Sequence, residues 1–177
     1  MADLPWSSAA IQLSEKIALR QVGLRLRPPF PAYLAGLPLP LAPNRLAAMG
    51  PLRVLWLGPD EWLVVVPEEA SADLPTRLAR ALARRRAAIS DLSSSRTIIE
   101  IGGAAARDLL AAGCGLDLHP RVFVPGQCAQ TLLARVPVIV DQLDAAPHYR
   151  VLVRRSYRSW LVDWLIDVAG GLAPTQR

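Results

Sequence analysis

Residues 53–67 read R-V-L-W-L-G-P-D-E-W-L-V-V-V-P, and this stretch decides the fold that the sequence predicts. Two apolar runs flank a turn made of Gly58, Pro59 and Asp60, with Trp56 before the turn and Trp62 after it. Short apolar runs separated by such turn formers are typical of two paired strands. The stretch therefore predicts a β-hairpin, although it indicates no chemistry.

The rest of the chain extends this pattern of paired strands with helices between them. Strands are expected at residues 17–26, 88–93, 97–102 and 149–153, and a second hairpin at 126–133 and 136–140. Helices are expected at 71–88, 104–112 and 157–169. Strands that meet in hairpins, with helices inserted between them, predict an α+β fold in which helices pack on one side of antiparallel sheets.

The helix expected at 71–88 accounts for the most basic segment of the chain. Ser71 or Asp73 can cap it, and its apolar stripe is Leu74, Leu78 and Leu82. Three arginines fall about 130° away, on a face open to water, and two more fall in the last turn, where the helix dipole favours positive charge: Arg77, Arg80, Arg84, Arg85 and Arg86. No aromatic residue is interleaved with them for base stacking, so nucleic-acid binding is not expected.

The length of 177 residues suits one domain of ordinary size or a two-layer pair of small subdomains, and a single domain over residues 1–177 is the prediction adopted, with the core at 50–168 implied by the family resemblance described below. The 177 residues are 52% hydrophobic, which is enough to fill a core. Residues 1–16 are expected to form a loosely held arm, and residues 28–51, after the strand at 17–26, a proline-rich connector. Its Leu-Pro-Leu-Pro-Leu run at 37–41 either packs leucines on the core, the favoured alternative, or extends into a partner's groove.

No apolar run reaches 18 residues, so no membrane span is expected. The first residues lack the pattern of a signal peptide, and a cytoplasmic location is the default expectation. Cys114 and Cys128 do not make a disulfide framework, so both are expected to be free, buried thiols.

Possible catalytic and metal-binding residues are sparse. Cys114, His119 and Cys128 form C-x4-H-x8-C, which supplies zinc-ligand types but lacks a fourth ligand. Nothing in the sequence brings these residues or His148 together as a thiol–imidazole pair. No metal, cofactor-binding or catalytic residue is therefore predicted in this chain.

Two further motifs have structural explanations. Gly102 and Gly103 precede a helix and could expose backbone N–H groups to an anion, but a full G-x-G-x-x-G is absent and a tight strand-to-helix turn is the favoured explanation. Asp60 and Glu61 are adjacent, so their side chains point apart in a strand and make a poor acid–base pair. Asp60 is expected to hydrogen-bond the backbone of the turn.

Six motifs together match one family. They are L-W-L-G-P-D-E-W-L at 55–63, D-L-S-S-S-R-T at 91–97, G-x-x-A-R-D-L-L at 103–110, C-G-L-D-L-H-P at 114–120, G-Q-C-A-Q-T at 126–131 and V-R-R-S-Y-R-S-W-L-V-D-W-L at 153–165. The chain thereby resembles the gamma subunit of heterotetrameric sarcosine oxidase over roughly residues 50–168. The first third of the chain fits this family more loosely.

The resemblance implies a non-catalytic role in a larger flavoenzyme. The family's complex oxidatively demethylates sarcosine to glycine, with hydrogen peroxide and methylene-tetrahydrofolate as products. Its FAD, FMN, NAD and tetrahydrofolate sites belong to larger subunits, and the partners implied for this chain are the alpha, beta and delta subunits. The implied fold is similar to the folate-binding, aminomethyltransferase-like fold, and the implied role is assembly and stability.

Four tryptophans are the candidate residues for a partner interface: Trp56, Trp62, Trp160 and Trp164. In the final helix, Trp160, Leu161, Trp164, Leu165 and Val168 are expected to form the apolar face. With Val162, that face widens to about 200°, broader than an ordinary surface helix buries. The helix is therefore either deeply embedded or in contact with another protein.

An alternative function is a stand-alone folate-binding protein with the same fold. Such a site requires an acidic group for the pterin and an aromatic wall. Glu100 is the only acid on its strand and so the candidate for that group, but no folate signature accompanies it.

Overall fold

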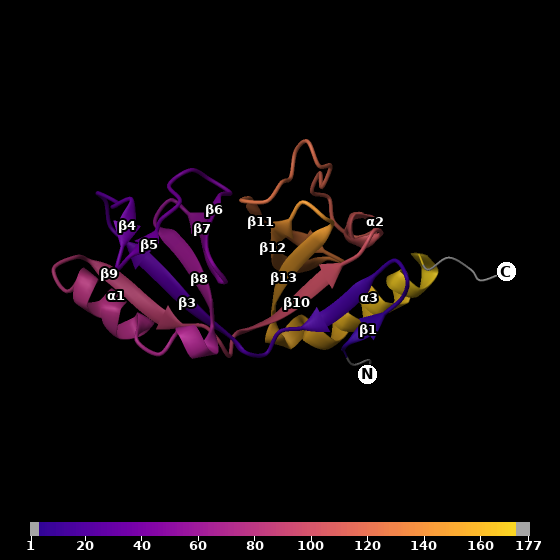
Figure 1. The fold of residues 1–177 in the computed structure, drawn as a ribbon, viewed down its shortest axis with the longest axis horizontal. Helices are drawn as coiled ribbons and strands as arrows, with labels where there is room; N and C mark the ends of the chain where they lie inside the picture. Colours follow the sequence, from indigo (N-terminus) through magenta and orange to yellow (C-terminus); the bar gives the residue numbers. More distant parts are fainter. Residues whose placement is uncertain (1–3, 173–177) are drawn as a thin grey trace. The chain divides into compact units, whose positions relative to one another are not determined.

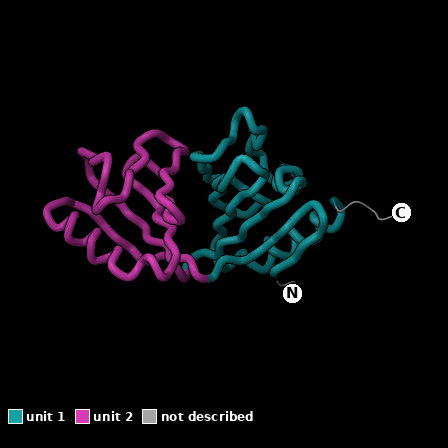
Figure 2. The backbone as a smooth tube through the Cα atoms, in the orientation of Figure 1, with its two compact units in different colours: residues 1–17, 95–177 teal, residues 18–94 magenta. Residues whose placement is uncertain are grey.

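The computed structural model describes residues 4–172, which fall into two compact units (Figure 2). Unit 2 consists of residues 18–94 and is inserted between the two segments of unit 1, residues 1–17 and 95–177. Each unit has its own sheet and its own hydrophobic cluster. The expectation that the chain behaves as a single domain stays a prediction.

Unit 1 is built on a six-stranded sheet with the order β1-β2-β10-β13-β12-β11, in which every neighbouring pair is antiparallel (Figure 1). Its strands are β1 (Trp6–Ser7), β2 (Gln12–Glu15), β10 (Arg96–Gly102), β11 (Cys128–Leu133), β12 (Val136–Asp144) and β13 (His148–Arg154). The second hairpin is confirmed: Ala134 and Arg135, both with positive φ, join β11 to β12. Positive φ at both central residues is the geometry of a tight hairpin turn.

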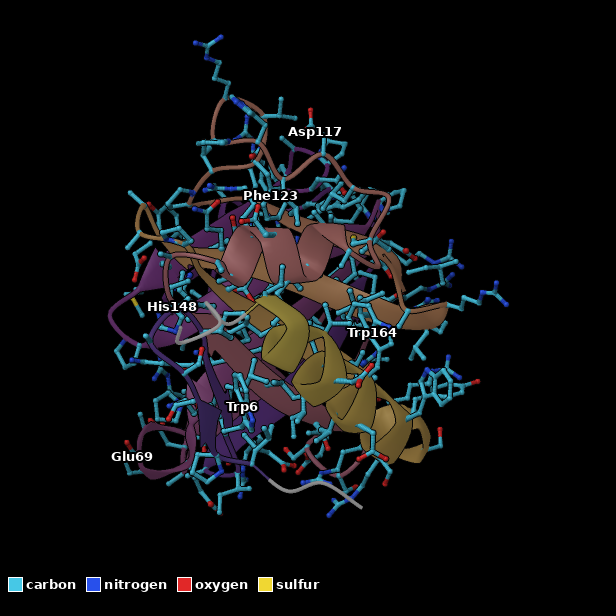
Figure 3. The ribbon with its side chains drawn as sticks, turned by 90° about the vertical axis from the view of Figure 1, so that its right-hand side faces the viewer. Trp6, Glu69, Asp117, Phe123, His148 and Trp164 are labelled. Atoms are coloured by element: carbon cyan, nitrogen blue, oxygen red, sulfur yellow. The ribbon has the colours of Figure 1, made fainter. Side chains whose placement is uncertain are left out.

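Two helices cover one face of this sheet: α2 (Ala106–Ala111) and α3 (Arg158–Leu172), the latter preceded by a 3-10 turn, η2 (Arg155–Tyr157). In Figure 3, α3 is the yellow helix that crosses the sheet, with Trp164 labelled at its side. Leu109, Leu110, Leu161 and Leu165 from the helices meet Val151 and other strand residues in one buried cluster. The helices therefore seal one face of the sheet from water.

Unit 2 has a five-stranded antiparallel sheet with the order β6-β7-β8-β3-β9 and a separate two-stranded pair, β4-β5. The strands are β3 (Leu19–Leu26), β4 (Tyr33–Leu34), β5 (Leu37–Pro38), β6 (Leu46–Met49), β7 (Leu52–Gly58), β8 (Glu61–Pro67) and β9 (Ala87–Asp91). A 3-10 turn, η1 (Glu68–Ala70), leads to α1 (Leu74–Leu82), which packs on one face of the sheet. Both units thus confirm the predicted α+β class with helices on one side of antiparallel sheets.

The predicted hairpin of residues 53–67 is confirmed as β7 and β8. Trp56 and Trp62 are direct partners across the two strands, so both side chains lie on the same face. Trp62 is 1% exposed and Trp56 packs half-buried against the same cluster. The hairpin therefore forms the centre of the core of unit 2.

The helix predicted at 71–88 is wrong at both ends, although its buried stripe of Leu74, Leu78 and Leu82 is confirmed. Ser71 does not cap the helix, because its hydroxyl donates to the Glu68 carbonyl, 2.7 Å away, in the preceding turn. The N-cap residue, Asp73, makes no side-chain capping bond. Arg85 and Arg86 lie beyond the helix, since the chain turns there to start β9, so the helix dipole does not explain them.

The N-terminal segment is not a loose arm, as far as it is described. Residues 1–3 lie outside the described residues, but β1 and β2 pair with each other and β2 pairs with β10. Ile11 and Leu13 are fully buried in the core of unit 1. The prediction was wrong because these strands are too short to carry a local pattern and depend on pairing with residues about 85 positions away.

The proline-rich connector places its leucines inside. Leu34, Leu37 and Leu39 belong to the core cluster of unit 2, which confirms packing on the core as the better alternative. Leu41, at the end of the Leu-Pro run, is half exposed. The run therefore does not extend as a whole into a partner's groove.

The final helix begins close to its predicted start but presents a different face to the core. Leu161, Val162, Leu165 and Ala169 are its buried residues, whereas Trp160 is 61% exposed. Trp160, which was predicted on the apolar face of a helix either embedded or in contact with a partner, is therefore not buried in this chain. Val162 takes its place, because the helix is rotated so that its smaller aliphatic residues meet the sheet.

Candidate functional site

A row of charged residues crosses three strands of unit 1 on the face opposite α2 and α3. Strand register places Glu100 of β10 opposite Arg150 of β13, and Arg150 opposite Asp141 of β12. The Arg150 guanidinium donates to Glu100 Oε1 over 2.9 Å, and the two side chains are only 9% and 12% exposed. Opposite charges on facing positions stabilise an antiparallel pair.

The second carboxylate oxygen of Glu100, Oε2, lies close to two more side chains. Lys16 Nζ lies 3.1 Å from Oε2, and His148 Nε2 lies 3.6 Å from the same atom. The other ring nitrogen of His148, Nδ1, lies 3.3 Å from Asp144 Oδ2. Figure 3 labels His148 within unit 1. Glu100 is thus the centre of a five-residue cluster of ionisable side chains, consisting of Glu100, Arg150, Lys16, His148 and Asp144.

The pKa of Glu100 reports the balance of forces in the cluster. Burial disfavours the ionised form, but the hydrogen bonds and charges of Arg150 and Lys16 outweigh it, so the pKa lies below its ordinary value. A carboxylate that is held ionised, with both oxygens engaged, is a poor proton acceptor at neutral pH. The cluster therefore has the chemistry of a structural ion network and not of an acid–base pair.

Replacing Glu100 with glutamine is expected to lower the free energy of unfolding at pH 7 by about 2 kcal/mol, the scale of a hydrogen bond to a charged group. Because the folded-state pKa of Glu100 is depressed, its contribution is present above the ordinary value of 4.5 and is lost as pH falls through the lower folded value. The difference between wild type and Glu100→Gln should therefore shrink on acidification. Urea unfolding at pH 7 and at a series of lower pH values measures this.

The matched control is Glu61→Gln, which breaks an exposed pair with Arg25 at 2.6 Å. Exposed ion pairs contribute only about 0–1 kcal/mol. Two results would contradict a structural role for Glu100. One is a loss of unfolding free energy in Glu100→Gln no larger than in Glu61→Gln, and the other is a difference between wild type and Glu100→Gln that grows at low pH.

The predicted zinc-type ligands are not brought together. His119 is exposed, and its Nδ1 accepts from the backbone N–H of Arg121 over 3.2 Å. Cys114 Sγ lies 3.7 Å from Thr131 Oγ1, and Cys128 is buried in β11. Both thiols are free, and Cys114 is only half-buried. Among residues 4–172, no three His, Cys, Asp or Glu side chains are grouped to hold a metal ion.

The Gly102-Gly103 pair has a packing explanation. Gly103 has a φ of +109°, and a Cβ there would lie 2.3 Å from the Ala10 carbonyl oxygen. The same carbonyl accepts from the backbone N–H of Ala105 over 3.1 Å. The glycine thus allows the β2 side of the sheet to approach the start of α2, as a tight turn requires.

Asp60 and Glu61 make separate contacts and do not act as a pair. Glu61 forms the cross-strand ion pair with Arg25, and the backbone carbonyl of Asp60 accepts from the N–H of Leu26 over 3.0 Å. The proposed hydrogen bond from the Asp60 side chain to the turn backbone stays a prediction.

The four candidate interface tryptophans have different environments. Trp62 is buried, donates from Nε1 to the Pro40 carbonyl over 2.8 Å and packs edge-to-face with Phe30. Trp56 and Trp164 are half-buried against the clusters of their own units. Only Trp160 is largely exposed, so it is the member of the set with most surface to offer a partner.

Trp160 lies on a surface formed by the start of α3 and the β11–β12 turn. Its indole Nε1 is 3.4 Å from the Ala134 carbonyl, and Tyr157, one turn earlier, is 42% exposed. Trp164, one turn later in α3, packs its ring directly against the backbone of Gly113. A Cβ added to Gly113 would lie only 2.6 Å from that ring. We call Tyr157 and Trp160 the aromatic surface. Large aromatics with a free apolar face and a polar atom are enriched at protein interfaces.

Sequence patterns alone did not predict most residues of the Glu100 cluster and of the aromatic surface. Glu100 was singled out, but Lys16, Arg150 and Asp144 were not, because the cluster draws on separate strands and loops. Tyr157 was also missed, although its spacing of three from Trp160 on a helical segment was a usable signal.

Comparisons with known proteins identify the family of the chain. The family model described as "Sarcosine oxidase, gamma subunit family" matches residues 30–171. The chain belongs to the sarcosine oxidase gamma subunit family. Among its relatives, the sarcosine oxidase subunit gamma of Corynebacterium sp. (strain P-1) is 35% identical over 174 residues, covering 94% of this chain and 84% of that protein. The corresponding Arthrobacter sp. subunit is 36% identical over 168 residues, covering 91% and 81%.

Two solved structures share the fold of this chain. A chain of heterotetrameric sarcosine oxidase from Corynebacterium sp. U-96, solved with pyrrole 2-carboxylate, superposes with a TM-score of 0.87 at 32% identity, covering 97% of this chain and 90% of that one. Aminomethyltransferase T of the glycine cleavage system from Bartonella henselae superposes with a TM-score of 0.64 at 13% identity, covering 89% and 46%. This second likeness concerns the fold alone, and it confirms the predicted resemblance to aminomethyltransferase-like proteins. Within residues 4–172 of this family member, no helix is long and apolar enough to cross a bilayer.

Proposed function

We propose that this chain is the non-catalytic gamma subunit of a heterotetrameric sarcosine oxidase-type complex and that it contributes assembly and stability. Membership of the gamma family supports a place in such a complex. The observation that carries the assembly role is the exposed indole of Trp160, 61% open to solvent on a helix whose opposite face is buried against the sheet. An apolar side chain of that size stabilises a complex most when a partner covers it.

In this proposal the chemistry belongs to the other subunits. The alpha, beta and delta subunits are the partners, and FAD, FMN, NAD and tetrahydrofolate bind to the larger ones. The complex as a whole demethylates sarcosine to glycine, with hydrogen peroxide and methylene-tetrahydrofolate as products, in the cytoplasm. The lowered pKa of Glu100 and its engaged oxygens support a structural role for the most prominent charged cluster of this chain.

The alternative of a stand-alone folate-binding protein finds little support in the side chains. Its candidate acid, Glu100, already accepts from Arg150 and pairs with Lys16. A pterin would have to displace these partners to reach the carboxylate. The residues therefore do not fit a folate site centred on Glu100.

The proposal is tested by co-expressing the chain with candidate alpha, beta and delta subunits from the same organism, with a tag on alpha. Flavin content, sarcosine-dependent hydrogen peroxide production and thermal inactivation are then measured with and without the chain. We expect co-purification in equal amounts, and faster inactivation when the chain is omitted. A flavin-containing complex that is equally active and equally stable without this chain would refute the assembly role.

Within that experiment, Trp160→Ala is expected to reduce co-purification at least tenfold, because an interface hot spot contributes about 2 kcal/mol or more. The free energy of unfolding of the chain itself should change by less than about 1 kcal/mol, since the side chain is exposed. Val122→Ala is the matched control: Val122 is an apolar residue of the same unit, 52% exposed, on a loop outside α3. Equal recovery of both variants would exclude Trp160 as an anchor.

A further inference from the structure

Two arginines of unit 2, Arg27 and Arg86, face each other where β3 ends and β9 begins. Leu26 of β3 is the register partner of Ala87 of β9, and one position further the backbone N–H of Arg27 donates to the Arg86 carbonyl over 3.1 Å. Leu26 belongs to the core beneath α1, so the neighbouring arginines project from the opposite face of the sheet. Like charges on directly facing positions repel each other.

Neither of these two guanidinium groups is neutralised within the protein. Both side chains are exposed, and among residues 4–172 neither forms an ion pair or a side-chain hydrogen bond. Arg25 differs, although it lies two positions before Arg27 and so on the same face, because its Nη2 is 2.6 Å from Glu61 Oε2. Arg27 and Arg86 are therefore the two available cations of this face.

The three arginines of this face line a pocket of about 240 Å³ that belongs wholly to unit 2. Asp60, in the turn between β7 and β8, also lines it, as do Ala87 and Ala88. Ala88 is the register partner of Arg25, so a single methyl group stands beside the arginines where a longer side chain would fill the space. The small residues thus leave the guanidinium groups open to a ligand.

The pocket keeps a positive charge after its internal pairs are counted. Arg25 and Glu61 cancel each other, which leaves Arg27 and Arg86 against the single carboxylate of Asp60. Within the described part of the chain, Asp60 forms no ion pair with either arginine. A concave site with excess positive charge attracts anions, and it attracts a dianion more strongly than a monoanion.

We propose that this pocket binds a phosphate group, either of inorganic phosphate or of a small phosphomonoester, between Arg27 and Arg86. A carboxylate has two oxygens, which one guanidinium fork already engages, whereas a phosphate group presents at least three acceptor oxygens and accepts from two forks at once. Its negative charge also offsets the repulsion between the facing arginines. The volume is below the range of roughly 300–1,000 Å³ that drug-sized ligands occupy, so the ligand is small. The site is independent of the role proposed above for the whole chain.

The test follows amide resonances of the full, isotopically labelled chain during titration with inorganic phosphate, glycerol 3-phosphate and acetate, at constant low ionic strength. We expect saturable shifts centred on residues 27, 60, 86 and 88 with both phosphates, and binding at least fivefold weaker for acetate. Tighter binding of glycerol 3-phosphate than of inorganic phosphate assigns the site to phosphomonoesters, and the reverse order assigns it to the free ion. Shifts that do not saturate, or acetate binding as tightly as the phosphates, would overturn the proposal.

Arg86→Gln should weaken phosphate binding about tenfold, the scale of one lost hydrogen bond to a charged group. Arg84→Gln is the matched control, since it removes the same charge from an exposed arginine that does not line the pocket. Equal weakening in the two variants would show that phosphate responds only to the net charge of the chain, against the proposal.

Asp60→Asn should change affinity in the opposite direction and tighten phosphate binding several-fold, because the carboxylate repels an anion from within the pocket. Glu69→Gln removes the same charge from an exposed residue outside the pocket and should leave the affinity unchanged. A folding defect cannot produce tighter binding, so this variant keeps the test decisive if Arg86→Gln is unstable. Unchanged or weaker binding in Asp60→Asn would contradict a phosphate site at this position.

Discussion

The substitution Trp62→Ala is expected to lower the free energy of unfolding by about 4 kcal/mol, within the range of roughly 3–5 kcal/mol for truncating a buried aromatic. The indole is 1% exposed and packs against Phe30 with ring centroids 5.3 Å apart at 71°. Removing it leaves a cavity at the centre of the core of unit 2. It also leaves the Pro40 carbonyl without the donor that lies 2.8 Å away. Urea unfolding monitored by far-UV circular dichroism measures the loss.

A second variant separates the volume of the indole from its hydrogen bond. Trp62→Phe keeps much of the ring but removes the donor, so its loss should be smaller, about 1–3 kcal/mol for an unsatisfied carbonyl. Trp160→Ala removes the same side chain from an exposed site and is the matched control. If Trp62→Ala is no more destabilising than Trp160→Ala, then the indole does not organise this core.

Gly103→Ala should lower the free energy of unfolding by about 3 kcal/mol or more, from backbone strain of roughly 1–3 kcal/mol and a steric clash in addition. The φ of +109° is unfavourable for any residue with a side chain, and the new Cβ would lie 2.3 Å from the Ala10 oxygen. The clash is with backbone, so no side chain can rotate away to relieve it. Relief requires β2 to move away from β10 and α2.

Gly115→Ala is the control, because Gly115 has no atom within 4 Å of the new Cβ and does not have a positive φ. It should be neutral within about 0.5 kcal/mol. Urea unfolding of both variants is combined with hydrogen exchange of the β2 amides, which should lose protection only in Gly103→Ala. Unchanged protection and stability in Gly103→Ala would show that the close approach to Ala10 is not required.

The elements that sequence predicted well are those with a local signal. The hairpin at 53–67 combines two apolar runs with a Gly-Pro-Asp turn, and the strands and turn need nothing from elsewhere in the chain to be recognised. The second hairpin and the leucine stripe of α1 are further cases. Among the elements that it missed, β1 and β2 have two and four residues, and β2 joins the sheet only by pairing with the distant strand β10.

Sequence by itself determined the fold class and the two hairpins of this protein, because periodicity and turn chemistry act over a few neighbouring residues, and its motifs indicated the family by resemblance. Only the tertiary structure decided which face of α3 is buried, and so that Trp160 is exposed while Trp62 is not. It alone also placed Glu100 beside Arg150, 50 residues away, and Arg96 opposite Arg154. Such neighbours are set by strand register, which the packing of whole sheets determines and no local pattern contains.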